Sequence, residues 1–171
     1  IGMKKIRVGV AGYGTIGQRL ADGVALQEDM ELVGIADLAP TLSLQALRER
    51  DMIGANGVKY DLYLVDGADK AAFDAKDIPV AGMFDELCQK VDIMLDSAPG
   101  GVGAKNKENY YDKYGVKAIF QGGEKNSVAD VFFHGYANYE KGVGQNYLKL
   151  TSCNTTGLQG AVPEIGIGST L

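Results

Sequence analysis

Tryptophan is absent from this sequence of 171 residues, cysteine occurs twice and histidine once. Two cysteines, Cys88 and Cys153, cannot build a disulfide framework, and their isolation gives no spacing typical of a zinc site. We therefore expect no bound metal ion and a reducing, cytoplasmic environment.

Long apolar runs and an excess of basic residues are also lacking. No apolar run approaches the roughly 18 residues of a membrane span. The 17 lysines and arginines are scattered among 22 acidic residues, and the formal net charge is −5. This charge distribution does not favour the phosphate backbone of a nucleic acid. We expect neither a membrane nor a nucleic acid as partner.

Glycine is the residue in excess, with 24 copies among 171 residues, about twice the usual share. The hydrophobic fraction of 46% and the charged fraction of 23% are ordinary for a globular protein. The composition therefore predicts a folded domain with many tight turns, and the length allows a sizeable core.

Strand-like and helix-like segments alternate along the chain. The patterns predict strands over 6–11, 31–36, 60–65, 92–98, 116–120 and 147–152, and helices over 15–27, 42–52, 68–76, 84–91 and 104–114. Segment 128–133 fits either a strand or the end of a helix, and the place of 60–65 in the sheet is open. Segment 159–171, rich in glycine and proline, is expected to be loosely ordered. The alternation favours an α/β fold of the doubly wound type, with a mostly parallel sheet.

The first predicted strand runs directly into Gly12-Tyr13-Gly14-Thr15-Ile16-Gly17, which fits G-x-G-x-x-G and opens a helix. Gly12 permits the tight turn, Gly14 lets a pyrophosphate approach the backbone, and Gly17 lets the helix pack on the strand. Free N–H groups at the start of the helix would face the phosphates. The motif in this context predicts a dinucleotide site of the Rossmann type.

Asp37 ends the second predicted strand, 20 residues after Gly17. An acidic residue in this place typically bonds the adenosine ribose hydroxyls of NAD, and its charge would repel the 2′-phosphate of NADP. NAD is therefore favoured, with NADP as the other option. The alternative is that the glycines only connect strand and helix and that Asp37 is a solvated loop residue.

A second polar turn, Ser152-Cys153-Asn154-Thr155-Thr156-Gly157, follows the last predicted strand. A cysteine at a strand-to-helix junction lies near a helix N-terminus, where the dipole stabilises a thiolate. Backbone N–H groups there can hold an oxyanion, and the threonine hydroxyls suit a phosphate. On these residues alone, a small buried thiol is the stronger interpretation of Cys153.

Four motifs, in the order G-Y-G-T-I-G, P-G-G-V-G-A-K-N, F-Q-G-G-E-K and S-C-N-T-T-G-L, closely resemble those of the archaeal-type glyceraldehyde-3-phosphate dehydrogenases. The resemblance covers roughly residues 4–158. It implies an NAD(P)-dependent, phosphorylating aldehyde dehydrogenase that acts on a small-molecule substrate. It also implies a dinucleotide-binding domain over 1–152 and the start of a catalytic domain over 153–171.

The resemblance also implies roles for single residues. Cys153 would attack the aldehyde carbon to form a thiohemiacetal, and Asn154 would help to hold the oxyanion. The substrate phosphate would lie near Thr155 and Thr156. The dinucleotide would lie along the glycine turn, Asp37 and two further turns, made of Pro99, Gly100 and Gly101 and of Gln121 and Gly122.

Two departures from the family qualify these expectations. Archaeal-type members often carry lysine where this chain has Asp37, so the cofactor preference does not transfer. Members are also about twice as long, and their second half holds the catalytic histidine. The only histidine here, His134, does not match that base and is expected to be structural. The alternative function is a stand-alone NAD-binding module or an assembly partner without turnover. The surface left uncovered predicts a homo-oligomer.

Two remaining features receive structural interpretations. Cys88 lies on the apolar face of a short predicted helix and is expected in the core. The cluster over 106–114, made of Asn106, Asn109, Tyr110, Tyr111 and Tyr114, suggests a recognition surface, but helical packing plus a solvated face explains it better.

Overall fold

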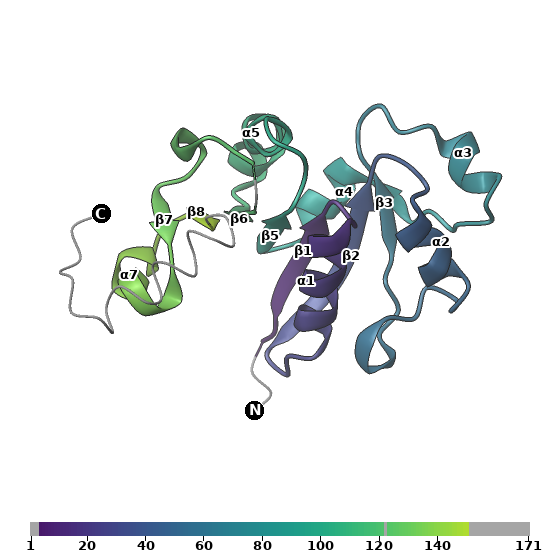
Figure 1. The fold of residues 1–171 in the computed structure, drawn as a ribbon, viewed down its shortest axis with the longest axis horizontal. Helices are drawn as coiled ribbons and strands as arrows, with labels where there is room; N and C mark the ends of the chain where they lie inside the picture. The colour runs from purple at the N-terminus through teal and green to yellow at the C-terminus, as the bar shows by residue number, and fades with distance from the viewer. Residues whose placement is uncertain (1–3, 122, 151–171) are drawn as a thin grey trace.

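The computed structural model describes residues 4–121 and 123–150 (Figure 1). The strands are β1 (Ile6–Ala11), β2 (Met30–Asp37), β3 (Leu62–Leu64), β4 (Gly82–Met83), β5 (Ile93–Asp96), β6 (Lys117–Phe120), β7 (Val131–Phe133) and β8 (Tyr147–Leu150). They form one eight-stranded sheet in the order β4-β3-β2-β1-β5-β6-β8-β7, in which every pairing is parallel. The α/β fold of the Rossmann type is thereby confirmed.

The strands are joined by short helices. These are α1 (Thr15–Ala25), α2 (Leu42–Arg48), α3 (Lys70–Asp74), α4 (Phe84–Lys90), α5 (Val102–Asn106), α6 (Asp112–Tyr114) and α7 (Gly135–Gly142). A π-helical turn, η2 (Lys107–Tyr111), joins α5 to α6, and two 3-10 turns lie at η1 (Ala55–Gly57) and η3 (Asn126–Val128). Crossovers from β1 to β2 and from β5 to β6 leave the centre of the sheet in opposite directions, which makes it doubly wound.

Buried residues divide into two clusters, one on each face of the sheet. One joins β1 and β2 to the inner faces of α1, α2 and α3, with Leu44, Leu47 and Phe73 fully buried. The other joins β5 and β6 to α4 and η2. Its fully buried residues include Phe84 and Cys88, which confirms the core position expected for that cysteine. Burial of each large apolar side chain, such as Leu44 or Phe84, adds roughly 2 kcal/mol to the free energy of unfolding.

Burial raises the pKa of the Cys88 thiol to about 12, so this cysteine stays protonated at neutral pH. It is therefore a packing residue and not a nucleophile.

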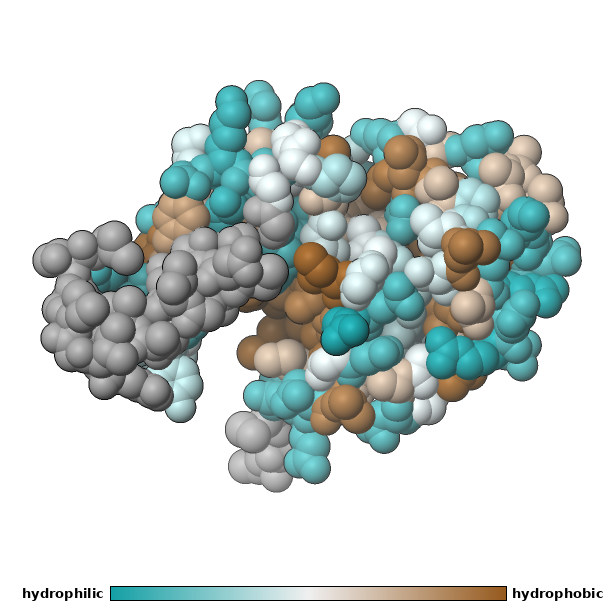
Figure 2. All heavy atoms as spheres, viewed as in Figure 1, coloured by the Kyte–Doolittle hydropathy of each residue, from teal (hydrophilic) through white to brown (hydrophobic). Residues whose placement is uncertain are grey.

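In the described residues no helix is long and apolar enough to cross a membrane. Hydrophobic side chains gather over the middle of the view in Figure 2, with hydrophilic ones around them.

Several elements differ from the sequence-based expectations or complete them. Segment 60–65 contributes β3, which lies between β2 and β4, and segment 128–133 contains β7 at the edge of the sheet. Helix α7 was not predicted, because it buries none of its residues and so lacks an apolar period. Its N-cap is His134, whose Nδ1 accepts a hydrogen bond from the Tyr136 N–H at 3.2 Å. This capping contact gives His134 a structural role, as expected.

An ion pair fastens the start of β1 to the turn before β5. Arg7 Nη2 lies 2.6 Å from Asp92 Oδ1, and both the Arg7 Nε and its backbone N–H donate to Asp92 Oδ2. These hydrogen bonds lower the pKa of Asp92 to about 2. Since both side chains are about 40% exposed, solvent screens much of the attraction.

The substitution Asp92→Asn is expected to lower the free energy of unfolding by about 1 kcal/mol at pH 7, measured by urea unfolding. A lowered folded-state pKa contributes stability above the unfolded pKa near 4, and this stability is lost as the pH falls toward 2. The difference between the two proteins should therefore close between pH 4 and pH 2. Asp74→Asn, in an exposed pair with Lys70, is the control, and a gap that stays constant with pH would contradict the assignment.

Candidate functional site

The turn between β1 and α1 depends on two close backbone contacts. Gly12 has a φ of +86°, a left-handed conformation that favours glycine, and its N–H donates to the Ala36 carbonyl at 2.8 Å. A Cβ built on Gly17 would lie 1.8 Å from the Gly12 carbonyl oxygen. Helix α1 therefore lies directly against the end of β1, which only glycine at position 17 allows.

Tyr13, which lies between the first two glycines of this turn, packs into the core. Tyr13 is 2% exposed, and its ring meets that of Tyr60 edge-on at 6.5 Å. Burial raises the pKa of Tyr13 to about 12, so it remains neutral. Tyr60 in turn donates from its hydroxyl to Asp22 of α1 at 2.7 Å. These contacts hold the turn from inside while its outer side stays free.

The outer side of the turn is open at Gly14. A Cβ there would meet nothing within 4 Å, and Gly14 precedes α1 without any side-chain cap. The first helical hydrogen bond joins the Gln18 N–H to the Gly14 carbonyl, so the amides of Thr15, Ile16 and Gly17 come before it. The first turn holds no acidic residue. Helix α1 thus presents unneutralised N–H groups and the positive end of its dipole.

Asp37 lies beside this turn at the end of β2. Its Oδ2 accepts a hydrogen bond from the Tyr13 N–H at 2.9 Å, and its Oδ1 accepts from the Leu38 N–H at 2.7 Å. The structure therefore brings Gly12, Gly14, Gly17 and Asp37 to one edge of the sheet, as the sequence predicted. A half-buried carboxylate held by two backbone amides has a defined position and still offers free lone pairs.

The two other predicted turns also lie at this edge. The Ser97 hydroxyl is within hydrogen-bond distance of the carbonyls of Ala11 and Gly12, at 3.0 and 2.8 Å, which joins the turn after β5 to the glycine turn. A Cβ on Gly100 would lie 2.9 Å from the Gly123 carbonyl oxygen, so Gly100 and Gly123 are neighbours. Gly122 and the segment with Cys153, Asn154, Thr155 and Thr156 lie outside the described residues.

Two buried carboxylates hold the segments that follow β5 and β6 at this edge. Asp96 is 1% exposed and accepts from the Asn106 amide at 2.9 Å, the Tyr111 hydroxyl at 2.6 Å and the Ala98 N–H at 3.0 Å. Burial raises the pKa of this carboxyl above its ordinary value, although the three hydrogen bonds oppose the shift. The carboxylate ties the end of β5 to the helix that follows.

Glu124 is the second of these carboxylates, and it accepts a hydrogen bond from the Gly103 N–H at 2.8 Å. This contact places a carboxylate at the start of α5, where it complements the helix dipole. The N-terminus of α5 is therefore already occupied by the chain itself. Of these two helices, α1 is the one whose N-terminus remains available to a phosphate.

A pocket of about 470 Å³ lies next to the glycine turn, between the ends of β1, β2 and β3 and the helix formed by α5 and η2. It is lined by Ala11, Gly12, Asp37, Leu38, Ala39, Val65, Asp66, Phe84, Ala98, Pro99, Val102, Lys105, Asn106, Asn109 and Tyr110. A larger hollow of about 680 Å³ beside Lys107 and Lys125 includes neither the glycine turn nor Asp37. The smaller pocket is the one next to the N-terminus of α1.

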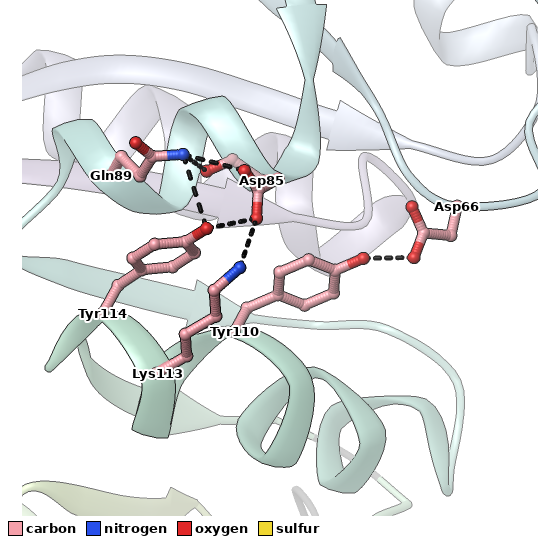
Figure 3. A network of polar contacts seen from close by, with 6 residues as sticks. All are labelled: Asp66, Asp85, Gln89, Tyr110, Lys113 and Tyr114. Atoms are coloured by element: carbon pink, nitrogen blue, oxygen red, sulfur yellow. Dashed lines mark hydrogen bonds and ion pairs between the residues drawn. The ribbon is translucent and has the colours of Figure 1, made fainter.

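Several residues of this pocket were not predicted from the sequence. Asp66 follows β3, whose place in the sheet the sequence left open, and Tyr110 and Asn109 belong to the cluster interpreted as packing and a solvated face. Tyr111 is indeed fully buried, and Tyr114 donates to Asp85 at 2.5 Å. Tyr110 instead reaches across to Asp66, as Figure 3 shows. The signal that could have found Asp66 is its position just beyond a strand.

Comparison with known proteins identifies sequence relatives. The chain is 45% identical over 156 residues to glyceraldehyde-3-phosphate dehydrogenase of Archaeoglobus fulgidus, covering 91% of this chain and 43% of that protein. It is 46% identical over 154 residues to the Pyrococcus abyssi protein of the same name, covering 90% and 43%. The chain therefore spans less than half the length of these relatives. A comparison with protein-family models finds no match.

Among solved structures, the fold resembles scyllo-inositol dehydrogenase from Lactobacillus casei, which was solved with bound NAD(H) and scyllo-inositol. The TM-score is 0.51 at 15% identity, and the match covers 97% of this chain and 43% of that one. At this identity the likeness concerns the fold alone.

Over the described residues, no group of three or more His, Cys, Asp or Glu side chains is placed to hold a metal ion.

The roles of the second and third glycines of the turn, Gly14 and Gly17, can be separated by a matched pair of substitutions. Because Gly17→Ala drives a methyl group into the Gly12 carbonyl, we expect it to lower the free energy of unfolding by about 3 kcal/mol. Gly14→Ala points into open space and should cost less than about 1 kcal/mol. Urea unfolding followed by circular dichroism measures both, and equal losses would refute the distinction between the two glycines.

Proposed function

On the premise that this chain is homologous to the N-terminal part of the archaeal glyceraldehyde-3-phosphate dehydrogenases, we propose that it is the cofactor-binding half of such an enzyme. Residues 1–152 form the dinucleotide-binding domain, and residues 153–171 begin the catalytic part. The activity is the NAD(P)-dependent, phosphorylating oxidation of the aldehyde.

The observation that carries this proposal is the pairing of an uncapped helix N-terminus with a held carboxylate. Thr15, Ile16 and Gly17 offer backbone N–H groups to a pyrophosphate, and Gly14 leaves room for it because no side chain fills that space. Asp37 accepts the N–H of Tyr13 in the same turn, and it would bond the hydroxyls of an adenosine ribose. The pocket of about 470 Å³ supplies space for the adenosine.

NAD is favoured over NADP by the same carboxylate. The 2′-phosphate of NADP would approach Asp37, whose two oxygens are already held by the amides of Tyr13 and Leu38. Because these amides fix its direction, the carboxylate cannot turn away without losing both hydrogen bonds. The turns at Pro99, Gly100 and Gly101 and at Gln121 and Gly122 would lie along the rest of the cofactor.

The reaction itself is assigned to the cysteine turn. The Cys153 thiolate adds to the aldehyde carbon, and Asn154 helps to hold the oxyanion that forms. Thr155 and Thr156 hold the substrate phosphate by their hydroxyls. When bound, NAD takes two electrons and a proton from the substrate carbon as a hydride. Inorganic phosphate then displaces the Cys153 thiolate from the acyl group.

A second candidate function is an NAD-binding module without turnover. It is supported by the position of His134, the one histidine of the sequence. Its Nδ1 accepts a hydrogen bond from the Tyr136 N–H at the start of α7. The cysteine chemistry needs a base that takes up a proton, and in the 171 residues no other imidazole can do so. Both candidates require dinucleotide binding and differ only in turnover.

The cofactor preference is tested by titrating the chain with NADH and with NADPH, followed by fluorescence. We expect NADH to bind at least about tenfold more tightly, a difference of about 1.4 kcal/mol. Asp37→Asn keeps an acceptor for the Tyr13 N–H but removes the charge, so it should reduce this ratio to a few-fold. Asp29→Asn, an exposed residue before the opposite end of β2, is the control. Binding of neither nucleotide would refute the proposed function, and tighter binding of NADPH would refute the preference for NAD.

Turnover is tested by mixing the chain with glyceraldehyde 3-phosphate, NAD and inorganic phosphate and recording NADH absorbance. Since His134 is engaged at α7, we expect a rate indistinguishable from that of Cys153→Ala. A rate that depends on Cys153 would show that these 171 residues suffice for catalysis, and it would exclude the module without turnover.

A further inference from the structure

Two carboxylates line the pocket beside the glycine turn, and they follow neighbouring strands. Asp37 ends β2, and in the parallel pairing of β2 with β3 it lies opposite Leu64. Asp66 comes two residues later, so it lies just beyond the same edge of the sheet. The proposed function uses Asp37 for the ribose and leaves Asp66 without a role.

Asp66 accepts a hydrogen bond from a tyrosine of the helix that follows α5. Tyr110 and Tyr111 are consecutive residues of the π-helical turn η2, and each donates its hydroxyl to a different aspartate. The Tyr111 hydroxyl donates to buried Asp96, and the Tyr110 hydroxyl donates to Asp66. The Tyr110 ring is fixed edge-on against Phe84 at 5.1 Å. Turns of this kind frequently occur at functional sites.

Asp66 and Tyr110 present hydrogen-bond acceptors to the pocket. Burial, and next the hydrogen bond to Asp66, raise the pKa of Tyr110, so its hydroxyl keeps its proton. That proton is directed at Asp66, which leaves the hydroxyl oxygen free only to accept. The carboxylate of Asp66 has further lone pairs after accepting this one bond. This end of the pocket therefore suits a ligand group that donates.

The purine bases of dinucleotides differ in whether they carry a hydrogen-bond donor or an acceptor that could face Asp66. Adenine carries an amino group, which donates, on the ring carbon where hypoxanthine and guanine carry a carbonyl oxygen, which accepts. A carbonyl oxygen facing Asp66 would meet a negative charge, whereas an amino group would form a charge-assisted hydrogen bond. The chemistry at Asp66 therefore discriminates between these bases.

We propose that Asp66, positioned by Tyr110, selects adenine as the base of the bound dinucleotide by accepting a hydrogen bond from its amino group. This inference rests on the proposed function, in which Asp37 holds the adjoining ribose. Asp66 is the specificity-determining residue, and Tyr110 is a positioning residue that acts through it.

The test compares the binding of NADH with that of reduced nicotinamide hypoxanthine dinucleotide, which differs only in the base. We expect the chain to bind NADH about tenfold or more tightly, as fits a hydrogen bond to a charged group. In Asp66→Ala this ratio should fall close to one, while the preference for NADH over NADPH persists. Tyr110→Phe keeps the carboxylate but frees it, and should give a ratio between the two.

Asp61→Asn is the matched control, because Asp61 is an exposed aspartate just before the opposite end of the same strand, β3. It should keep the full ratio. Thermal unfolding of each variant verifies that it is folded. Equal affinity of the unmodified chain for both dinucleotides, or a full ratio in Asp66→Ala, would overturn the inference while leaving the proposed function intact. Binding of neither NADH nor NADPH would overturn both.

Discussion

The contact between Gly17 and the Gly12 carbonyl is the constraint from which the site is built. A Cβ at position 17 would lie 1.8 Å from that oxygen, so helix α1 can meet the end of β1 only through glycine. This closeness aims the first amides of α1 across the edge of the sheet. It also places the Tyr13 N–H where Asp37 accepts it at 2.9 Å, which couples the ends of β1 and β2. The proposed phosphate and ribose positions thus both depend on the contact between Gly17 and the Gly12 carbonyl.

The chain neutralises one helix start and leaves another free. Glu124 occupies the start of α5 by accepting the Gly103 N–H, and Asp96 holds the turn before α5 through three hydrogen bonds. Both carboxylates are almost fully buried. They act as internal ligands that connect the ends of β5 and β6 to α5. The N-terminus of α1 has no such ligand, so an anion gains more by binding there.

Two consecutive tyrosines after α5 connect the core to the pocket. In the π-helical turn η2, Tyr111 reaches Asp96 in the core while Tyr110 reaches Asp66 at the pocket. A local irregularity in one helix therefore connects the buried network to the rim of the pocket. It also explains why a segment interpreted as packing plus a solvated face contributes to the lining of the pocket (Figure 3).

The sequence by itself determined the α/β fold and the glycine turn, because these depend on local periodicity and on a motif of six adjacent residues. It also predicted Asp37 as the partner of this turn, from its place at the end of the second strand. It also determined the relationship to the dehydrogenases, which depends on whole motifs. Only the tertiary structure decided which strand lies beside β2, and therefore that Asp66 enters the pocket. Short strands such as β3 carry too little pattern to reveal their neighbours, and α7 carries no apolar period at all. The direction of Tyr110 was decided in the same way, since its partners Asp66 and Phe84 belong to other elements of the fold.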